Sequence, residues 1–379
     1  MVREVVFHLG DCKTGSTSIQ RVLAQNAWQA DGISILYSTG GNHIPTAKTL
    51  TQKKEFKFRG LRFGQLNRHL TKSRADYAVV SAEHFEFTDP SVLSDAVQTY
   101  LPKFAGKIRY IAYVRPHAER LMSSFAEQSK NGQIHHSVED LHRLYQENGR
   151  LFYTPRFEKW RRVFGDMFTV RPMIRDRLYK QDVVTDFFHY LLEGKPFKIT
   201  NDTAANVSLS LEDLVMIREM RRHIRKNSTG LGKPLQVFGR HFGRVLASQR
   251  AVEGTKLRLH KALAEDVVQV YREDAIALDA GFFEGTPMSD MLETAVTKAI
   301  NKPQSFLARD HYNAREMRRI LAVADMMQRL MEADPRFFTQ AAKGPKQRVG
   351  ILGQKPQLPW WWRLHKFVPE SILNGFSGR

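Results

Sequence analysis

Cysteine is almost absent from this chain, which has one cysteine, Cys12, among 379 residues. A single thiol excludes an intrachain disulfide framework and any zinc site built from cysteines. Long apolar runs are absent as well, and no stretch approaches the roughly 20 apolar residues that span a membrane. The N-terminus has no apolar segment of the kind that secretory signals carry. We therefore expect a soluble protein of the cytoplasm.

Acidic residues are in the minority, because 58 Lys and Arg outnumber 39 Asp and Glu and give a formal net charge of +19. A charge of this size implies an anionic partner, such as a nucleotide, an acidic glycan, a nucleic acid or a lipid surface. No recognised nucleic-acid module accompanies the charge, so we expect no specific nucleic acid as partner. Hydrophobic residues make up 42% of the chain, which is enough for one large domain or two smaller ones.

Strands and helices alternate in the first third of the chain. Apolar runs typical of strands lie at 4–8, 33–37, 77–80, 108–114 and, later, 168–171. Helical periodicity follows from Ser16, at 62–74, at 91–101 and after residue 116. This alternation predicts an α/β fold of three layers, with a central, mostly parallel sheet flanked by helices.

The chain beyond about residue 180 has mainly helical patterns. They cover 181–192, 211–226, 257–278 and 313–332. Between them, 227–254 mixes Gly, Pro and basic residues, which predicts a long irregular loop. We therefore expect a mainly helical C-terminal part.

The first strand is followed by a loop with spaced glycines. The loop reads His8-Leu9-Gly10-Asp11-Cys12-Lys13-Thr14-Gly15-Ser16-Thr17-Ser18. Such a strand–loop–helix aims backbone N–H groups and the positive end of a helix dipole at one anion. The phosphate loop of ATPases reads G-x-x-x-x-G-K-S/T. Gly10 and Gly15 keep that spacing, but Ser16 stands at the lysine position and the lysine is Lys13. The sequence therefore predicts a phosphate loop for a ligand other than ATP with magnesium.

Two further strand ends carry polar residues. Glu83 and His84 follow the strand at 77–80, and Arg115 follows the strand at 108–114, with Ser123 eight residues later. Because the carboxyl ends of parallel strands meet at one edge of a sheet, these side chains are expected to face one crevice. A strand-end arginine and a helix serine at this offset could hold the same anion.

Together the motifs resemble those of sulfotransferases that use 3′-phosphoadenosine 5′-phosphosulfate (PAPS), above all the bacterial carbohydrate-type members. The matching elements are the loop at 8–18 and Tyr113-Val114-Arg115-Pro116, continued to Ser123-Ser124-Phe125. Further similarity lies at 170–187 and 206–210. The resemblance covers about residues 1–300. It implies a P-loop-like sulfotransferase domain at 1–300 and, at 301–379, a C-terminal helix with a basic, Trp-containing tail.

The resemblance also implies roles for the nucleotide motifs. The loop would hold the 5′-phosphosulfate and the Arg115–Ser123 pair the 3′-phosphate of PAPS. The loop residues concerned are Gly10, Cys12, Lys13, Thr14, Gly15, Ser16, Thr17 and Ser18. Charge builds on the leaving oxygen in sulfuryl transfer as in phosphoryl transfer, and Lys13 is the candidate that stabilises it without a metal ion. The alternatives are a solvated Lys13, and an ion pair of Arg115 with Glu119 or Asp182.

The acceptor hydroxyl needs a base, and Glu83 and His84 compete for this role. The resemblance favours Glu83. In the alternative, Glu83 caps the next turn and His84 is a packing residue. Cys12 lies in the anion loop, where the helix N-terminus and Lys13 are expected to lower the pKa of its thiol.

Basic residues are concentrated in the C-terminal half. Helical spacing places Arg218, Arg221, Arg222 and Arg225 on one exposed face. This face suits either a solvated surface or a groove for an anionic carbohydrate or glycolipid acceptor. The three tryptophans at 360–362 suit either a peripheral anchor at the inner membrane face or packing onto the domain.

The sequence thus predicts an enzyme that transfers the sulfuryl group of PAPS to a hydroxyl of a carbohydrate or glycolipid. One alternative is a P-loop kinase or NTPase, which would need a lysine at position 16 and a carboxylate for magnesium. The other is a non-catalytic protein that binds an anion or a nucleic acid. Acceptor choice is expected to lie in the loops at 38–60 and 227–254.

Overall fold

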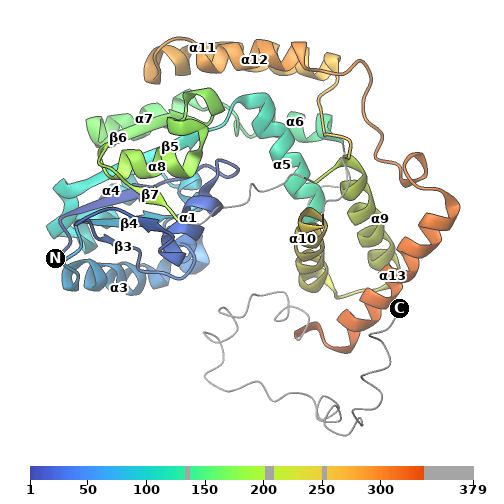
Figure 1. Ribbon diagram of the computed structural model, residues 1–379, viewed down its shortest axis with the longest axis horizontal. Helices are drawn as coiled ribbons and strands as arrows, with labels where there is room; N and C mark the ends of the chain where they lie inside the picture. Colours follow the sequence, from blue (N-terminus) through green and yellow to red (C-terminus); the bar gives the residue numbers. More distant parts are fainter. Residues whose placement is uncertain (133–136, 201–208, 250–253, 337–379) are drawn as a thin grey trace, which may run out of the picture.

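A five-stranded parallel sheet forms the centre of the N-terminal half of the protein (Figure 1). The computed structural model describes residues 1–132, 137–200, 209–249 and 254–336. In spatial order the strands are β3 (Ile35–Leu36), β4 (Tyr77–Ser81), β1 (Glu4–His8), β5 (Ile108–Val114) and β6 (Phe168–Pro172). Each neighbouring pair is parallel. β2 (Trp28–Gln29) and β7 (Lys198–Ile199) form a separate antiparallel pair. The predicted α/β fold is confirmed.

The strands bury alternate side chains in two cores, one on each face of the sheet. Val5 and Phe7 of β1 belong to the larger core and Val6, between them, to the smaller one. This is the period-two pattern of a strand buried on both faces. The larger core is covered by α3 (Arg59–Lys72), α4 (Pro90–Tyr100), α5 (His117–Asn131) and α7 (Thr154–Phe164). The smaller core is covered by α1 (Ser16–Gln25) and α8 (Val183–Leu191).

Several short elements have no counterpart in the sequence prediction. The helices among them are α2 (Ile44–Thr51), α6 (Val138–Glu147), α7 and α12 (Pro287–Thr297). The 3₁₀ turns are η1 (Lys53–Phe58), η2 (Glu83–Phe87), η3 (Pro102–Lys107), η4 (Gly165–Met167), η5 (Arg175–Arg177), η6 (Tyr179–Gln181) and η7 (Ala308–Asp310). The expected loop at 38–60 therefore contains α2 and η1.

Three helices of the C-terminal half form a bundle with its own small core, while α11 (Lys261–Phe282) and α12 pack against the larger core of the sheet. The bundle consists of α9 (Leu211–Asn227), α10 (Gly232–Ser248) and α13 (Ala314–Ala333). Figure 1 shows these three helices beside one another, away from the sheet, with α5 running from the sheet to them.

The predicted irregular loop at 227–254 is wrong, because α10 occupies most of it. Leu235 and Phe238 are buried in the bundle core. A Cβ on Gly239 would lie 2.2 Å from the carbonyl oxygen of Lys130 in α5. Gly239 favours a loop by its intrinsic propensity, but in the structure it allows α10 and α5 to pack closely. Tertiary contacts thus override the local preference of the residue.

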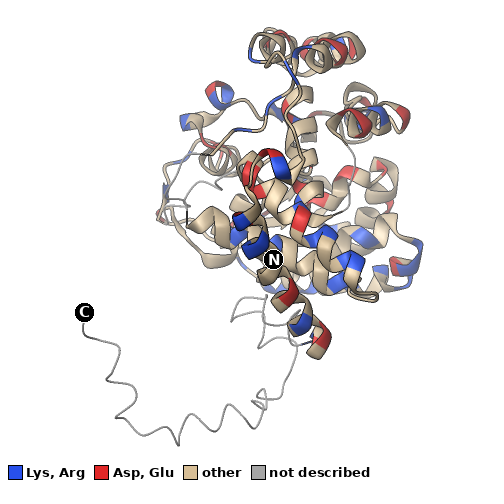
Figure 2. Cartoon of the chain, turned by 90° about the vertical axis from the view of Figure 1, so that its right-hand side faces the viewer, with Lys and Arg blue, Asp and Glu red and all other residues tan. Residues whose placement is uncertain are grey.

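The single exposed face of arginines predicted for residues 218–225 is wrong as well. Arg221 is only 4% exposed, and its guanidinium donates to the carbonyl oxygen of Leu235. The Arg218 guanidinium lies 4.8 Å from the centre of the Phe306 ring. Arg222 remains exposed and pairs with Glu219 on the same helix. Basic and acidic residues are interspersed on the helices in Figure 2.

The C-terminal division at residue 300 stays a prediction. The helix α13 beyond it packs against α9 from before it. Residues 206–208 of the resemblance and the tryptophans at 360–362 lie outside the described residues, so the tail's membrane role is likewise still a prediction. Among the helices that the structure describes, none is long and apolar enough to cross a bilayer.

Candidate functional site

The carboxyl ends of β1, β4 and β5 bring the predicted site residues to one edge of the sheet. The loop at 10–15 follows β1, η2 with Glu83 and His84 follows β4, and Arg115 follows β5 at the start of α5. The site thus combines a loop, a short turn and the first half of a helix, each placed by a buried parallel strand.

Three residues of the loop at 10–15 have positive φ angles, which set the course of its backbone. They belong to Gly10 (φ 40°), Lys13 (φ 72°) and Gly15 (φ 82°). Gly15 caps α1, and a Cβ there would lie 2.6 Å from Cγ1 of Val183 in α8. A left-handed lysine is uncommon, and such residues often occur at functional sites.

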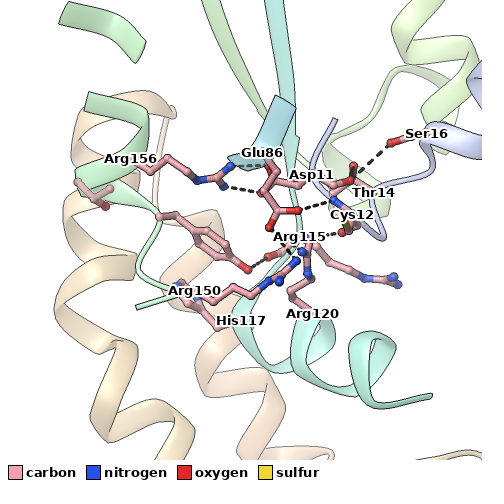
Figure 3. A network of polar contacts seen from close by, with 12 residues as sticks. Asp11, Cys12, Thr14, Ser16, Glu86, Arg115, His117, Arg120, Arg150 and Arg156 are labelled. Atoms are coloured by element: carbon pink, nitrogen blue, oxygen red, sulfur yellow. Dashed lines mark hydrogen bonds and ion pairs between the residues drawn. The ribbon is translucent and has the colours of Figure 1, made fainter. Parts of the chain in front are cut away.

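Buried ion pairs hold this loop from behind (Figure 3). Arg156 binds both carboxylate oxygens of Asp11, at 2.7 and 2.6 Å. Glu86 accepts the Cys12 amide at 3.0 Å and pairs with Arg120 at 2.8 Å, while Arg120 also donates to the Cys12 carbonyl oxygen. Although burial raises the pKa of Glu86, Arg120 and Arg150 hold it below its ordinary value. Glu86 therefore stays ionised and fixes the loop backbone.

The hydroxyl groups of the loop differ in where they lie. Thr14 is buried and donates to the carbonyl oxygen of Asp11 at 2.6 Å, and Ser16 is directed to the same oxygen at 3.5 Å. Thr17 is exposed, in the first turn of α1. The amides of Ser16 and Thr17 precede the first helical hydrogen bonds and have no intrahelical acceptor. The start of α1 can therefore offer N–H groups to an anion.

Arg115 and Ser123 lie together, as their offset predicts. Nη1 of Arg115 is 3.2 Å from Oγ of Ser123 and 3.1 Å from the carbonyl oxygen of Lys13. Arg115 also pairs with Glu119, at 3.3 Å. The alternative pair with Asp182 is absent, since Asp182 caps α8. A single guanidinium therefore links the loop to the helix that carries Ser123.

Lys13 makes an ion pair that the sequence analysis missed. Its Nζ lies 3.0 Å from Oε2 of Glu127, and Nζ of Lys130 lies 2.5 Å from the same oxygen. Burial raises the pKa of Glu127, but the two lysines outweigh this effect and lower it to about 2. Helical spacing could have found Glu127, because it follows Ser123 by four residues on α5.

The two candidate bases, Glu83 and His84, are half-buried in η2. Burial raises the pKa of Glu83; Lys13 opposes that shift, and Glu86 and Glu127 add to it. Burial and Lys48 lower the pKa of His84. A carboxylate with a raised pKa is the stronger proton acceptor of its kind. The shift at Glu83 makes its carboxylate more basic, and the shift at His84 favours its neutral imidazole, which is the form that accepts a proton.

The expected lowering of the Cys12 pKa is wrong. Burial raises the pKa of the thiol above its usual range, and the charges of Glu86 and Glu83 add to this. This shift disfavours the thiolate, which is the reactive form of cysteine. Its amide and carbonyl groups are already bonded to Glu86 and Arg120.

The two ion pairs that hold the loop could not be predicted from a motif or a spacing in the sequence. Asp11 and Arg156 are 145 positions apart, and Glu86 and Arg120 are 34 apart. Among the described residues, no three His, Cys, Asp or Glu side chains gather closely enough to hold a metal ion.

No family model matches this chain, and no curated protein matches it. Among solved structures, it is similar to the crystal structure of a sulfotransferase from Alicyclobacillus acidocaldarius. The two chains are 13% identical with a TM-score of 0.40, over 76% of this chain and 99% of the other. A likeness at this level carries no inference about the activity of this chain.

Proposed function

We propose that this protein is a sulfotransferase that moves the sulfuryl group of PAPS to a hydroxyl of a carbohydrate or glycolipid. The observation that carries this proposal is the contact of Arg115 with both Ser123 and the loop backbone at Lys13. It joins the two motifs on which the resemblance rests, although they are about 100 residues apart in sequence.

The residues present fit a nucleotide that carries phosphate groups at the 3′ and 5′ positions of its ribose. Arg115 and Ser123 offer N–H and O–H donors for the 3′-phosphate, and a guanidinium suits a phosphate particularly well. The amides at the start of α1 and the Lys13 ammonium suit the 5′-phosphosulfate. Arg115 and Lys13 already lie at this edge of the sheet, where each pairs with a carboxylate of α5.

The same residues can carry out the transfer. Glu83 takes the proton of the acceptor hydroxyl, whose oxygen forms the new bond to sulfur. The bond from sulfur to the bridging oxygen breaks, and that oxygen keeps the electron pair. Lys13 stabilises the charge there, and the nucleotide leaves as 3′-phosphoadenosine 5′-phosphate (PAP). His84 is the alternative base.

The surface next to Glu83 supports a sugar acceptor. Phe87, at the other end of η2, is 49% exposed, and the Arg150 guanidinium lies 4.8 Å from the centre of its ring. An exposed ring offers an apolar face to a sugar, while Arg150 itself pairs with Glu86 at 3.5 Å.

The Arg115→Ala variant tests the proposed donor. Isothermal titration calorimetry would compare PAP with AMP, which lacks the 3′-phosphate. We expect the wild type to prefer PAP and the variant to lose that preference, by about tenfold or more, because a charge-assisted hydrogen bond is lost. Lys13→Ala should bind PAP and fail in turnover. Equal affinity of wild type and Arg115→Ala for PAP would refute the assignment of the 3′-phosphate site.

A further inference from the structure

A row of polar side chains on α5 faces the two cations of the proposed donor site. Glu119, Ser123 and Glu127 follow one another at intervals of four and therefore share one face of the helix. Glu119 pairs with Arg115, and Glu127 pairs with Lys13. Each cation thus has a carboxylate partner of its own within the protein.

The ion pair with Glu127 engages the Lys13 ammonium, which is the group that the proposed reaction needs at the leaving oxygen. The two side chains are only 29% and 27% exposed, so solvent screens their attraction less than it would on an open surface. In this pair, the Lys13 ammonium gives one of its three N–H donors to a carboxylate at 3.0 Å, which neutralises part of the charge that the bridging oxygen of the donor would need. The carboxylate and the donor are both anions, and they compete for Lys13.

Lys130 lowers the free-energy cost of separating Lys13 from Glu127. Its Nζ already lies 2.5 Å from the same Oε2 of Glu127. If Lys13 leaves, Glu127 still has a cation, so no buried carboxylate is left unpaired. The stem of Lys130 packs against α10, where a Cβ on Gly243 would lie 2.9 Å from its Cδ. Lys130 is therefore held in place beside Glu127.

We propose that Glu127 is a positioning residue that holds the Lys13 side chain against α5 until the donor binds. Lys130 then remains as the partner of Glu127. The inference rests on the proposed function, since the donor is what displaces Glu127. In the opposite hypothesis, the Lys13–Glu127 ion pair only orders the Lys13 side chain for the donor. Loss of the pair would then weaken donor binding. The two accounts predict effects of opposite sign.

The test measures PAP affinity by calorimetry in the full chain. Glu127→Gln keeps the shape of the side chain and removes its charge. We expect it to bind PAP about three- to tenfold more tightly, because Lys13 no longer has to leave a carboxylate. In a Lys13→Ala background the same change should have no effect, which separates this role from a general loss of negative charge.

Lys130→Met gives the second arm, since methionine keeps the stem that packs on α10. We expect weaker PAP binding, because Glu127 then has Lys13 alone. The loss should vanish when Glu127→Gln is also present; a loss that persists would mean that Lys130 contacts the donor directly and would overturn its role here. Lys261→Met and Glu265→Gln, at an exposed pair on α11, are the matched controls and should change nothing.

A measurement without donor checks the same pair. Acetic anhydride labels free amines, and peptide mass spectrometry would follow the rate at Lys13. We expect faster labelling in Glu127→Gln than in the wild type. Unchanged or weaker PAP binding by Glu127→Gln, or equal labelling, would overturn this inference alone. Failure of the wild type to bind PAP would overturn the proposed function and the inference with it.

Discussion

Glu83 and Glu127 both interact with Lys13, yet their surroundings move their carboxyl pKa values in opposite directions. Burial dominates at Glu83 and raises its pKa, whereas two lysines dominate at Glu127 and lower its pKa to about 2. At neutral pH, Glu127 is a poor proton acceptor and Glu83 a better one. Two carboxylates beside one lysine can thus hold different roles, one as a base and one as a counter-ion.

The direction of the Glu83 shift gives a pH prediction. A protonated Glu83 cannot accept the acceptor proton, so transfer should fall as the pH is lowered through a value above the ordinary 4.5 of glutamate. A carbon-13 NMR titration of the side-chain carboxyls, assigned with Glu83→Gln, measures the pKa directly. The same variant should bind PAP and lose transfer. A titration at or below 4.5, or full transfer by Glu83→Gln, would move the base elsewhere.

Single residues differ in how far the sequence could predict them. Arg115 and Ser123 were predictable, because a fixed offset on one strand and one helix sets their separation. Asp11 with Arg156, and Glu86 with Arg120, join segments far apart in the chain, and only the packed fold brings them together. These pairs hold the loop in its position at the edge of the sheet.

Helices and strands form where apolar periodicity is strong. Strand β5 agrees with its predicted range at both ends, and α8, α9, α11 and α13 lie within a few residues of theirs. The helix α10 escaped prediction because Gly, Pro and basic residues dominate its sequence. Its stability comes from burial against α9 and α5, a property of the packed bundle that local propensity does not contain.

The close approach of α10 to α5 gives a prediction for Gly239. Gly239→Ala should destabilise the protein by about 1–3 kcal/mol, since the added methyl group overlaps the backbone of Lys130. Gly281→Ala is the matched control, because Gly281 lies in α11 with nothing within 4 Å, and it should gain about 0.5 kcal/mol. Urea unfolding measures both. A neutral Gly239→Ala would mean that α10 does not lie against α5.

The molecule as a whole carries a net charge of +19, but this charge is not collected on the predicted arginine face. Arg221 is buried, Arg218 lies over an aromatic ring, and acidic residues are interspersed in Figure 2. Of the four arginines predicted to share one face of α9, Arg222 and Arg225 are exposed, whereas Arg221 is not. Lys13 and Arg115, the cations of the proposed donor site, lie instead at the edge of the sheet where β1, β4 and β5 end.

The central claim is that this edge binds a 3′-phosphorylated nucleotide, and thermal unfolding tests it most directly. The wild-type protein would be unfolded with PAP, AMP, ADP and ATP, each with and without Mg²⁺. A ligand at 100 times its Kd stabilises a protein by about 2.7 kcal/mol, which raises Tm by about a few degrees in a chain of this size. We predict selective stabilisation by PAP that does not depend on magnesium. A preference for ATP with Mg²⁺, or no shift with PAP, would contradict the account.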